Sequence, residues 1–211
     1  MGRRLSTLVL AVAGLLSAVP AGAAGLEVID RGASRVILLA GTIQRSDVAA
    51  IAALLEGPEP VREVRFDSKG GSLEAGIEIG ERIRARRLAT RVTGGAVCAS
   101  ACVYAFLGGM IRAVEEGGRI GIHMASAAFN DAYVDAVKRV LTDTAAGGVD
   151  DKVRTIILLN EQFSAIAARR QARYLVQMGV SLRLLDPVFN TSHLEIHWLT
   201  PFELADYNVV N

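Results

Sequence analysis

A serine, a histidine and a pair of glycines in this chain are spaced in a way that suits nucleophilic chemistry. Ser100 lies between two alanines, whose small side chains would let the backbone of a substrate approach its hydroxyl. Upstream, Gly70 and Gly71 can adopt positive φ and present a backbone N–H outward, as an oxyanion site requires. Downstream, His123 carries an imidazole, which can take up and return a proton near neutral pH. The set predicts a serine nucleophile with a histidine base.

The serine and the histidine also have plainer interpretations. A serine immediately before a helix commonly serves as its N-cap. A histidine at the end of an apolar run can be a buried side chain that is hydrogen-bonded to backbone. Ser100 and His123 follow the glycine pair in the order that such a site needs, and this order favours the catalytic interpretation over both alternatives.

The elements that would position these residues alternate along the chain. Apolar patterning predicts strands near residues 26–30, 35–39, 61–66, 88–92, 111–114 and 119–122, and helices over 46–55, 72–86 and 101–107. Ser46 and Asp47 are expected to cap the first helix. The alternation predicts a parallel α/β core with right-handed crossovers. Ser100 would lie where a turn enters a helix, and His123 would follow the end of a strand.

Residues 130–178 depart from this alternation and read as helical throughout. Gly147 and Gly148 divide the stretch in two. We expect a long helical arm near the C-terminus that serves as an oligomer interface or as a lid.

Residues 68–76, 98–101 and 121–124 resemble, in order and spacing, the oxyanion, nucleophile and histidine segments of the Clp protease proteolytic subunit. The resemblance runs from about residue 36 to 126, with a weaker echo at 198–204. It implies the Clp/crotonase-like fold, built of stacked ββα spiral units. It further implies that Gly71 and Ala101 donate the oxyanion N–H groups, and that Gly70, Gly71 and Ser72 bind an extended peptide or protein substrate.

The third member of the triad departs from the family pattern. The family's aspartate should fall close to Ile196, and no carboxylate stands at that position. Glu195 is the nearest candidate to orient His123, with Asn190 and Asp186 as alternatives. A dyad without an orienting acid is a further reading, and so is a protein that keeps the fold as a catalytically inactive binding or assembly module.

A lysine base is the other alternative for the chemistry. Some secreted relatives that share this superfold use a Ser/Lys dyad, and Lys138 lies on the helix after His123. Lys69, beside the glycine pair, is a second candidate. Lysines on amphipathic helices usually face solvent, which favours the histidine.

The two cysteines flank the nucleophile. Cys98 and Cys102 are four residues apart, so one helical turn would bring their Cα atoms to roughly 6 Å, within disulfide range. A bond would close a short loop and so contribute little entropy; it would instead fix the turn that presents Ser100. The alternative is that both pack as small buried thiols beneath that turn.

The N-terminus has the features of a secretory signal peptide. Two arginines precede an apolar stretch over residues 8–19, and small residues follow it, so cleavage is expected after Ala23. An uncleaved membrane anchor is the alternative, but the apolar stretch is shorter than the roughly 20 residues that span a bilayer. The chain would then consist of the signal peptide, 1–23, and one domain, 24–211, in the periplasm or outside the cell.

Composition and the predicted compartment limit which partners, cofactors and substrates are expected. A net charge of +1 without a basic patch argues against nucleic acid. No metal-ligand spacing, phosphate loop or dinucleotide fingerprint occurs, so neither a metal nor another cofactor is expected. An ATP-driven unfoldase is not expected outside the cytoplasm, so substrates would be short or unfolded peptides. The same compartment disfavours coenzyme A thioesters, on which most crotonases act. If the arm is an oligomer interface and not a lid, a homo-oligomer is expected.

Overall fold

The computed structural model describes residues 25–31, 34–145 and 147–211. The signal peptide predicted for residues 1–23 lies outside this part of the chain. Within the described residues, no helix combines the length and apolar character needed to cross a membrane.

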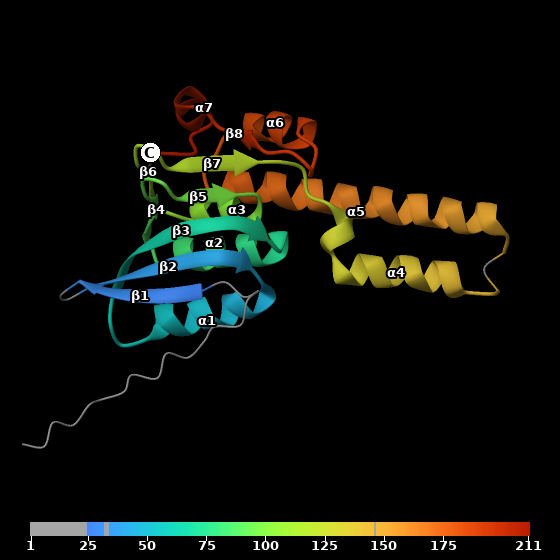
Figure 1. Ribbon diagram of the computed structural model, residues 1–211, viewed down its shortest axis with the longest axis horizontal. Coiled ribbons are helices and arrows are strands. Elements are labelled where there is room, and N and C mark those ends of the chain that lie inside the picture. Colours follow the sequence, from blue (N-terminus) through green and yellow to red (C-terminus); the bar gives the residue numbers. More distant parts are fainter. Residues whose placement is uncertain (1–24, 32–33, 146) are drawn as a thin grey trace, which may run out of the picture.

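A sheet with helices packed against it forms the body of the molecule (Figure 1). Its strands run in the order β1-β2-β3-β5-β7-β8, and β4 branches off to pair with both β3 and β6. The strands are β1 (Gly25–Arg31), β2 (Ser34–Ile43), β3 (Val61–Gly71), β4 (Ala89–Val92), β5 (Val97–Ala99), β6 (Ile111–Val114), β7 (Arg119–Ile122) and β8 (His197–Trp198). The helices are α1 (Arg45–Glu56), α2 (Leu73–Ala85), α3 (Ala101–Leu107), α4 (Asp131–Thr142), α5 (Val149–Gln177), α6 (Leu185–Asn190) and α7 (Pro201–Asp206), with short 3-10 turns at Ala127–Phe129 and Leu182–Leu184.

The long strand β3 divides the sheet into two parts. Its first half pairs with β4 over residues 63–65, and its second half pairs with β5, where Ser68 lies opposite Cys98. Strand β5 pairs in turn with β7, and these pairings are parallel. The carboxyl ends of β3, β5 and β7 therefore lie side by side, which is where α/β sheets gather functional groups.

Helices α2 and α3 cover one face of this sheet with apolar side chains. Phe66 of β3 packs edge to face against Phe106 of α3, with ring centroids 6.3 Å apart. Ile79 and Ile83 of α2 are fully buried. The hydroxyl of Ser72 caps α2 by accepting the Ala75 N–H at 3.2 Å. The predicted amphipathic helix over 72–86 is confirmed.

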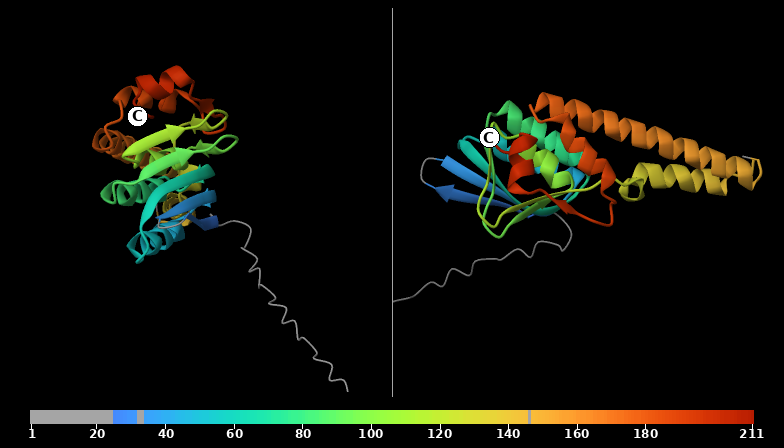
Figure 2. Two further views of the ribbon diagram at one scale, coloured as in Figure 1. Left: turned by 90° about the vertical axis from the view of Figure 1, so that its left-hand side faces the viewer. Right: turned by 90° about the horizontal axis from the view of Figure 1, so that it is seen from above.

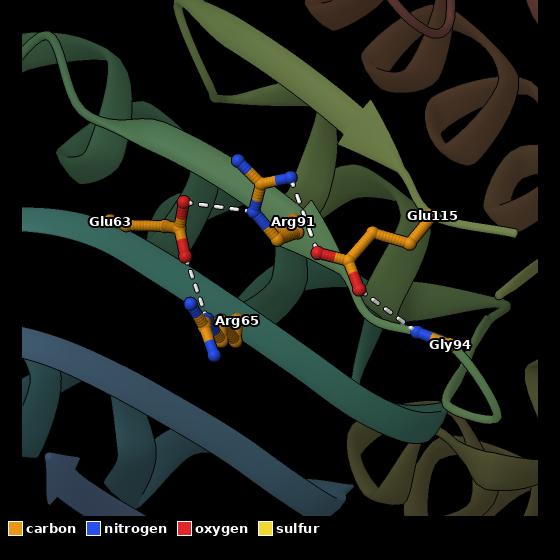
Figure 3. Close-up of polar contacts among 5 residues, drawn as sticks. All are labelled: Glu63, Arg65, Arg91, Gly94 and Glu115. Carbon is orange, nitrogen blue, oxygen red and sulfur yellow. Dashed lines mark hydrogen bonds and ion pairs between the residues drawn. The ribbon is translucent and has the colours of Figure 1, made fainter.

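A charged network lies on the other face of the sheet (Figure 3). The carboxylate of Glu63 accepts Nε–H bonds from Arg65 at 2.7 Å and from Arg91 at 2.9 Å. Arg91 also pairs with Glu115, which accepts the Gly94 N–H at 3.2 Å. Burial raises the pKa of Glu63, but the hydrogen bonds and charges of the two arginines outweigh it and hold that pKa below its usual range. The network ties β3 to β4 and to the turn that follows β4.

Helices α4 and α5 form a hairpin that extends away from the body (Figures 1 and 2). Tyr133 of α4 packs on Phe163 of α5, with ring centroids 5.4 Å apart. The second half of α5 enters the core through Ala167, Gln171, Tyr174 and Leu175. The hairpin also exposes large apolar side chains, namely Leu141, Val149, Val153, Ile157, Leu158 and Ile166. The predicted arm over residues 130–178 is confirmed.

The sequence prediction differs from the structure in three places. Helix α1 is capped by Gln44, not by Ser46 or Asp47; Asp47 lies in its first turn and accepts the Gln44 N–H at 2.7 Å. Strand β5 was not predicted, because three residues are too few to show a periodic pattern. The C-terminal elements α6, β8 and α7 are also short, and they depend on packing against β7 and the core.

Candidate active site

Ser100 occupies a strained turn between β5 and α3. Its backbone lies at φ 55°, ψ −125°, a region that residues with a side chain rarely adopt. Such a conformation costs on the order of 1–3 kcal/mol and persists only where its surroundings impose it. The Ser100 N–H donates to the Gly121 carbonyl at 2.9 Å, which ties the turn to β7. A sharp strand-to-helix turn of this kind is how several hydrolases expose a nucleophilic hydroxyl.

Cys98 and Cys102 form a disulfide across this turn, with Cα atoms 5.3 Å apart. Both residues are fully buried. Of the two alternatives open from the sequence, the structure has the bond and not a pair of free thiols. The bond joins the end of β5 to the first turn of α3, on either side of Ser100.

The glycine pair lies directly against the nucleophile. Gly70 has φ +105° and Gly71 φ +147°. A Cβ at Gly70 would lie 2.7 Å from the Ser100 Cβ and 3.0 Å from the Ala101 nitrogen, and a Cβ at Gly71 would collide with the backbone of Ile43. Only residues without a Cβ fit here. The role of Gly71 and Ala101 as oxyanion donors stays a prediction, and their placement is compatible with it, because both line the same cavity as Ser100.

Ser68 braces the glycine pair, a role that the sequence analysis missed. This buried hydroxyl accepts the Gly70 N–H at 3.1 Å and donates to the Gly41 carbonyl at 2.5 Å. It thereby links the end of β3 to the end of β2. Its inward position in the alternating pattern of β3 was the available signal.

His123 follows the last residue of β7 and lines the same cavity as Ser100. Its Nδ1 lies 2.8 Å from the carbonyl oxygen of Met124. Because a carbonyl can only accept, this contact places the proton of the neutral ring on Nδ1 and leaves Nε2 with a free lone pair. Among the described residues, no hydrogen bond joins the Ser100 hydroxyl to this ring. Such contacts are often long before substrate binds.

The carboxylate predicted to orient His123 does not contact it. Glu195 is exposed in the loop after α6, where its backbone N–H donates to Ser192. Asn190 and Asp186 are exposed on α6 and do not reach the ring either. In the part of the chain that the structure describes, the carbonyl of Met124 is the group that orients His123.

The two lysine alternatives lie away from the cavity. Lys138 is exposed on α4 and forms an ion pair with Asp135 at 3.2 Å. Lys69 is exposed on β3. Neither lines the cavity that contains Ser100. The structure therefore gives a Ser/Lys dyad no support.

The cavity has a volume of about 470 Å³ and is closed on one side by the arm. Phe163 and Gln171 of α5 line it, as does His193, and the sequence analysis identified none of them. Tyr104, one turn after Ser100, donates its hydroxyl to the Gln171 side chain and connects the nucleophile helix to the arm. Burial raises the pKa of Tyr104, so the phenol stays a neutral donor.

A smaller, mostly apolar cavity of about 320 Å³ adjoins the first one. The two share the lining residues Ala125, Ser126, Phe163, Gln171 and His193. Across the described residues, no cluster of three or more histidine, cysteine, aspartate or glutamate side chains could bind a metal ion.

No protein-family model matches the sequence. The search of curated proteins also finds no match. Solved structures do match. ClpP1 from Listeria monocytogenes is 20% identical, with a TM-score of 0.52, over 83% of this chain and 88% of that one. A point mutant of ClpP1 gives 22% identity and a TM-score of 0.46 with the same coverage. The fold is Clp protease-like.

The likeness to ClpP1 confirms the predicted α/β fold class. At 20% identity it shows the fold alone, so the roles of individual residues rest on the geometry of this chain. That geometry brings Ser100, His123, Gly71 and Ala101 to one cavity of the Clp-like fold and leaves Glu195 outside it.

Proposed function

We propose that the protein is an exported serine peptidase in which Ser100 attacks the substrate and His123 acts as the base. The observation that carries the proposal is the conformation of Ser100. A strained, non-glycine turn at a cavity that His123 also lines is what a preorganised nucleophile requires.

In this reaction, the Ser100 oxygen bonds to the scissile carbonyl carbon while Nε2 of His123 takes the proton of the hydroxyl. The negative charge that develops on the carbonyl oxygen is stabilised by the N–H groups of Gly71 and Ala101. The protonated His123 then gives its proton to the leaving amine, the C–N bond breaks, and an acyl-enzyme remains. Water, deprotonated by the same Nε2, releases the acid and regenerates Ser100.

The Met124 carbonyl supplies the orienting contact that a carboxylate supplies in a triad. It holds the ring in the tautomer with a free Nε2, as the chemistry needs. As a neutral group, it stabilises the imidazolium less than a carboxylate would. Loss of the triad carboxylate costs about 10⁴ in kcat in a well-studied serine protease, so we expect slow turnover here.

The cavity fits a short stretch of extended peptide. At about 470 Å³ it has the size of a small-molecule site and does not admit a folded domain. We therefore propose short or unfolded peptides as substrates, cleaved without an ATP-driven unfoldase.

A catalytically inactive binding module is the second candidate. It is favoured by the missing carboxylate at His123 and by the lack of a hydrogen bond between Ser100 and the ring in the described residues. Such a module would bind peptides in the same cavity and release them uncut.

Hydrolysis of a fluorogenic unfolded peptide library by the purified mature protein separates the two candidates. We expect cleavage by the wild type and none by Ser100→Ala. Ser46→Ala is the matched control, because Ser46 is exposed on α1 and does not line the cavity. Peptide binding with no cleavage by the wild type would favour the inactive module.

The compartment and the assembly complete the proposal. Export predicts that the protein from the periplasmic or secreted fraction has the mass of residues 24–211; a mass that includes residues 1–23 would contradict cleavage.

For the arm we propose self-association. Arg154, Ile157, Leu158 and Glu161 are all exposed on α5. If two copies of α5 pack antiparallel about a twofold axis between Ile157 and Leu158, Arg154 of each copy faces Glu161 of the other. Sedimentation of Arg154→Glu against the wild type tests it, and equal masses would refute it.

A further inference from the structure

The disulfide joins two residues that lie on either side of the nucleophile in the sequence. Cys98 lies two residues before Ser100, in β5, and Cys102 lies two residues after it, in α3. Cys98 is held in place by both neighbours of its strand, opposite Ser68 on one side and Ile120 on the other. The bond therefore links the sheet, which is fixed, to the helix that begins at Ala101.

The short loop indicates what the bond is for. A disulfide between residues only four apart removes less entropy from the unfolded chain than one that closes a long loop, so its contribution to global stability is the smaller part of its effect. What it restrains is the turn itself. Ser100, at the centre of that turn, has φ 55°, ψ −125°, and a free chain would relax from there to negative φ. That relaxation would reorient the Cα–Cβ bond and move the hydroxyl.

We propose that Cys98 and Cys102 are positioning residues: their disulfide holds Ser100 in its reactive conformation, so that the protein reacts well only when this bond is formed. This inference rests on the proposed function and names a redox control of the same site. Formation of the bond removes two electrons and two protons from the two thiols. A second disulfide, that of an oxidising thiol reagent, accepts them and is reduced to two thiols. A dithiol reductant reverses the step.

Other contacts of the turn remain in the reduced protein, and they limit the loss of reactivity that reduction can cause. The Ser100 N–H still donates to the Gly121 carbonyl at 2.9 Å, and the Val103 N–H to the Ser100 carbonyl at 3.0 Å. We therefore expect partial loss of reactivity. A tenfold decrease corresponds to about 1.4 kcal/mol less stabilisation of the reactive conformation.

The test is the second-order rate of labelling by a fluorophosphonate probe. Oxidised wild type is compared with reduced wild type and with the double variant Cys98→Ala/Cys102→Ala. We expect roughly tenfold slower labelling of the reduced protein and of the variant, both of which should remain folded and unfold cooperatively in urea. Reoxidation should restore the wild-type rate, and reductant should leave the variant unchanged. A folded variant that is labelled as fast as the oxidised wild type would overturn the proposal.

Amide hydrogen exchange provides a readout that does not depend on activity. We expect residues 99–103 to exchange at least tenfold faster after reduction, while β3 and α2 exchange as before. If the oxidised wild type is not labelled at all, the proposed function fails, and exchange still decides whether the bond restrains the turn. Equal exchange in both redox states would refute the restraint. The reduced wild type serves this purpose even if the double variant does not fold.

Discussion

Replacing Gly70 by alanine tests the contact between the glycine pair and the nucleophile. The new Cβ would lie 2.7 Å from the Ser100 Cβ and 2.8 Å from the Ala99 carbonyl oxygen, closer than real Cβ atoms approach. The backbone at φ +105° adds strain, because side chains rarely adopt it. Both effects act at the site, so Ser100 must move or the glycine turn must open.

The expected losses follow from these two contributions. The conformation costs about 1–3 kcal/mol for a residue with a side chain. The overpacking costs about 1–3 kcal/mol more. The free energy of unfolding of Gly70→Ala should therefore fall by about 2–6 kcal/mol. Displacement of the nucleophile should slow fluorophosphonate labelling by at least about tenfold, since 1 Å of misplacement can cost about a hundredfold.

Gly95→Ala is the matched control. Gly95 also has positive φ, +82°, but no atom lies within 4 Å of a Cβ placed there. It carries the conformational cost alone, about 1–3 kcal/mol, and its labelling rate should equal that of the wild type. Urea unfolding and labelling kinetics measure both variants. If Gly70→Ala loses no more stability than Gly95→Ala and reacts at the wild-type rate, the glycine pair does not abut Ser100.

Three further predictions concern charge and proton transfer. Because the folded-state pKa of Glu63 is depressed, its contribution to stability is present above the ordinary glutamate value of about 4.5 and is lost as pH falls through the depressed value. Acid titration of unfolding should thus be shallower for Glu63→Gln, and identical curves would contradict the network. The buried guanidinium of Arg112 donates to the carbonyls of residues 109, 178, 208 and 209. Arg112→Met should lower the free energy of unfolding by about 2–4 kcal/mol, the lost hydrogen bonds outweighing relief of a buried charge; an unchanged urea midpoint would count against this. Finally, His123→Ala should slow peptide cleavage as much as Ser100→Ala, since the two act as a unit, while Lys138→Ala leaves the rate unchanged. The reverse result would favour a lysine base.

Much of the scaffold could be predicted because its signals are local. Ile79 and Ile83 of α2 lie one helical turn apart on its buried side, and Ser72 is a good N-cap, so both that side and the start of the helix follow from residue type. Ser100 was predicted where a turn enters a helix, and the structure has it there, although the short strand before the turn was not predicted. The disulfide was one of two readings, because spacing alone does not separate it from two buried thiols.

The orientation of His123 could not be predicted in the same way. The group that binds Nδ1 is the backbone carbonyl of Met124, and every residue type carries a carbonyl. A search for a carboxylate therefore pointed to Glu195, which the structure leaves exposed. The contact depends on how the chain turns after β7, where the Met124 N–H donates to the Thr191 carbonyl at 3.0 Å.

The residues of the arm that line the cavity could not be predicted from the sequence either, because they lie far from Ser100 along the chain. Tyr104 and Gln171 are 67 residues apart and meet only when α5 packs against α3. Phe163 reads as one apolar position among many in a helix of 29 residues. Its place in the lining of the cavity that contains Ser100 follows from tertiary packing and leaves no local pattern.

The most direct test of the central claim is to locate the fluorophosphonate adduct by peptide mass mapping of the oxidised protein. In this reaction the Ser100 oxygen bonds to phosphorus, fluoride leaves, and His123 takes the hydroxyl proton. We predict one adduct per chain, on Ser100, with labelling abolished in Ser100→Ala and greatly slowed in His123→Ala. An adduct on another residue, or a folded wild-type protein that is not labelled, would contradict the assignment of Ser100 as the nucleophile.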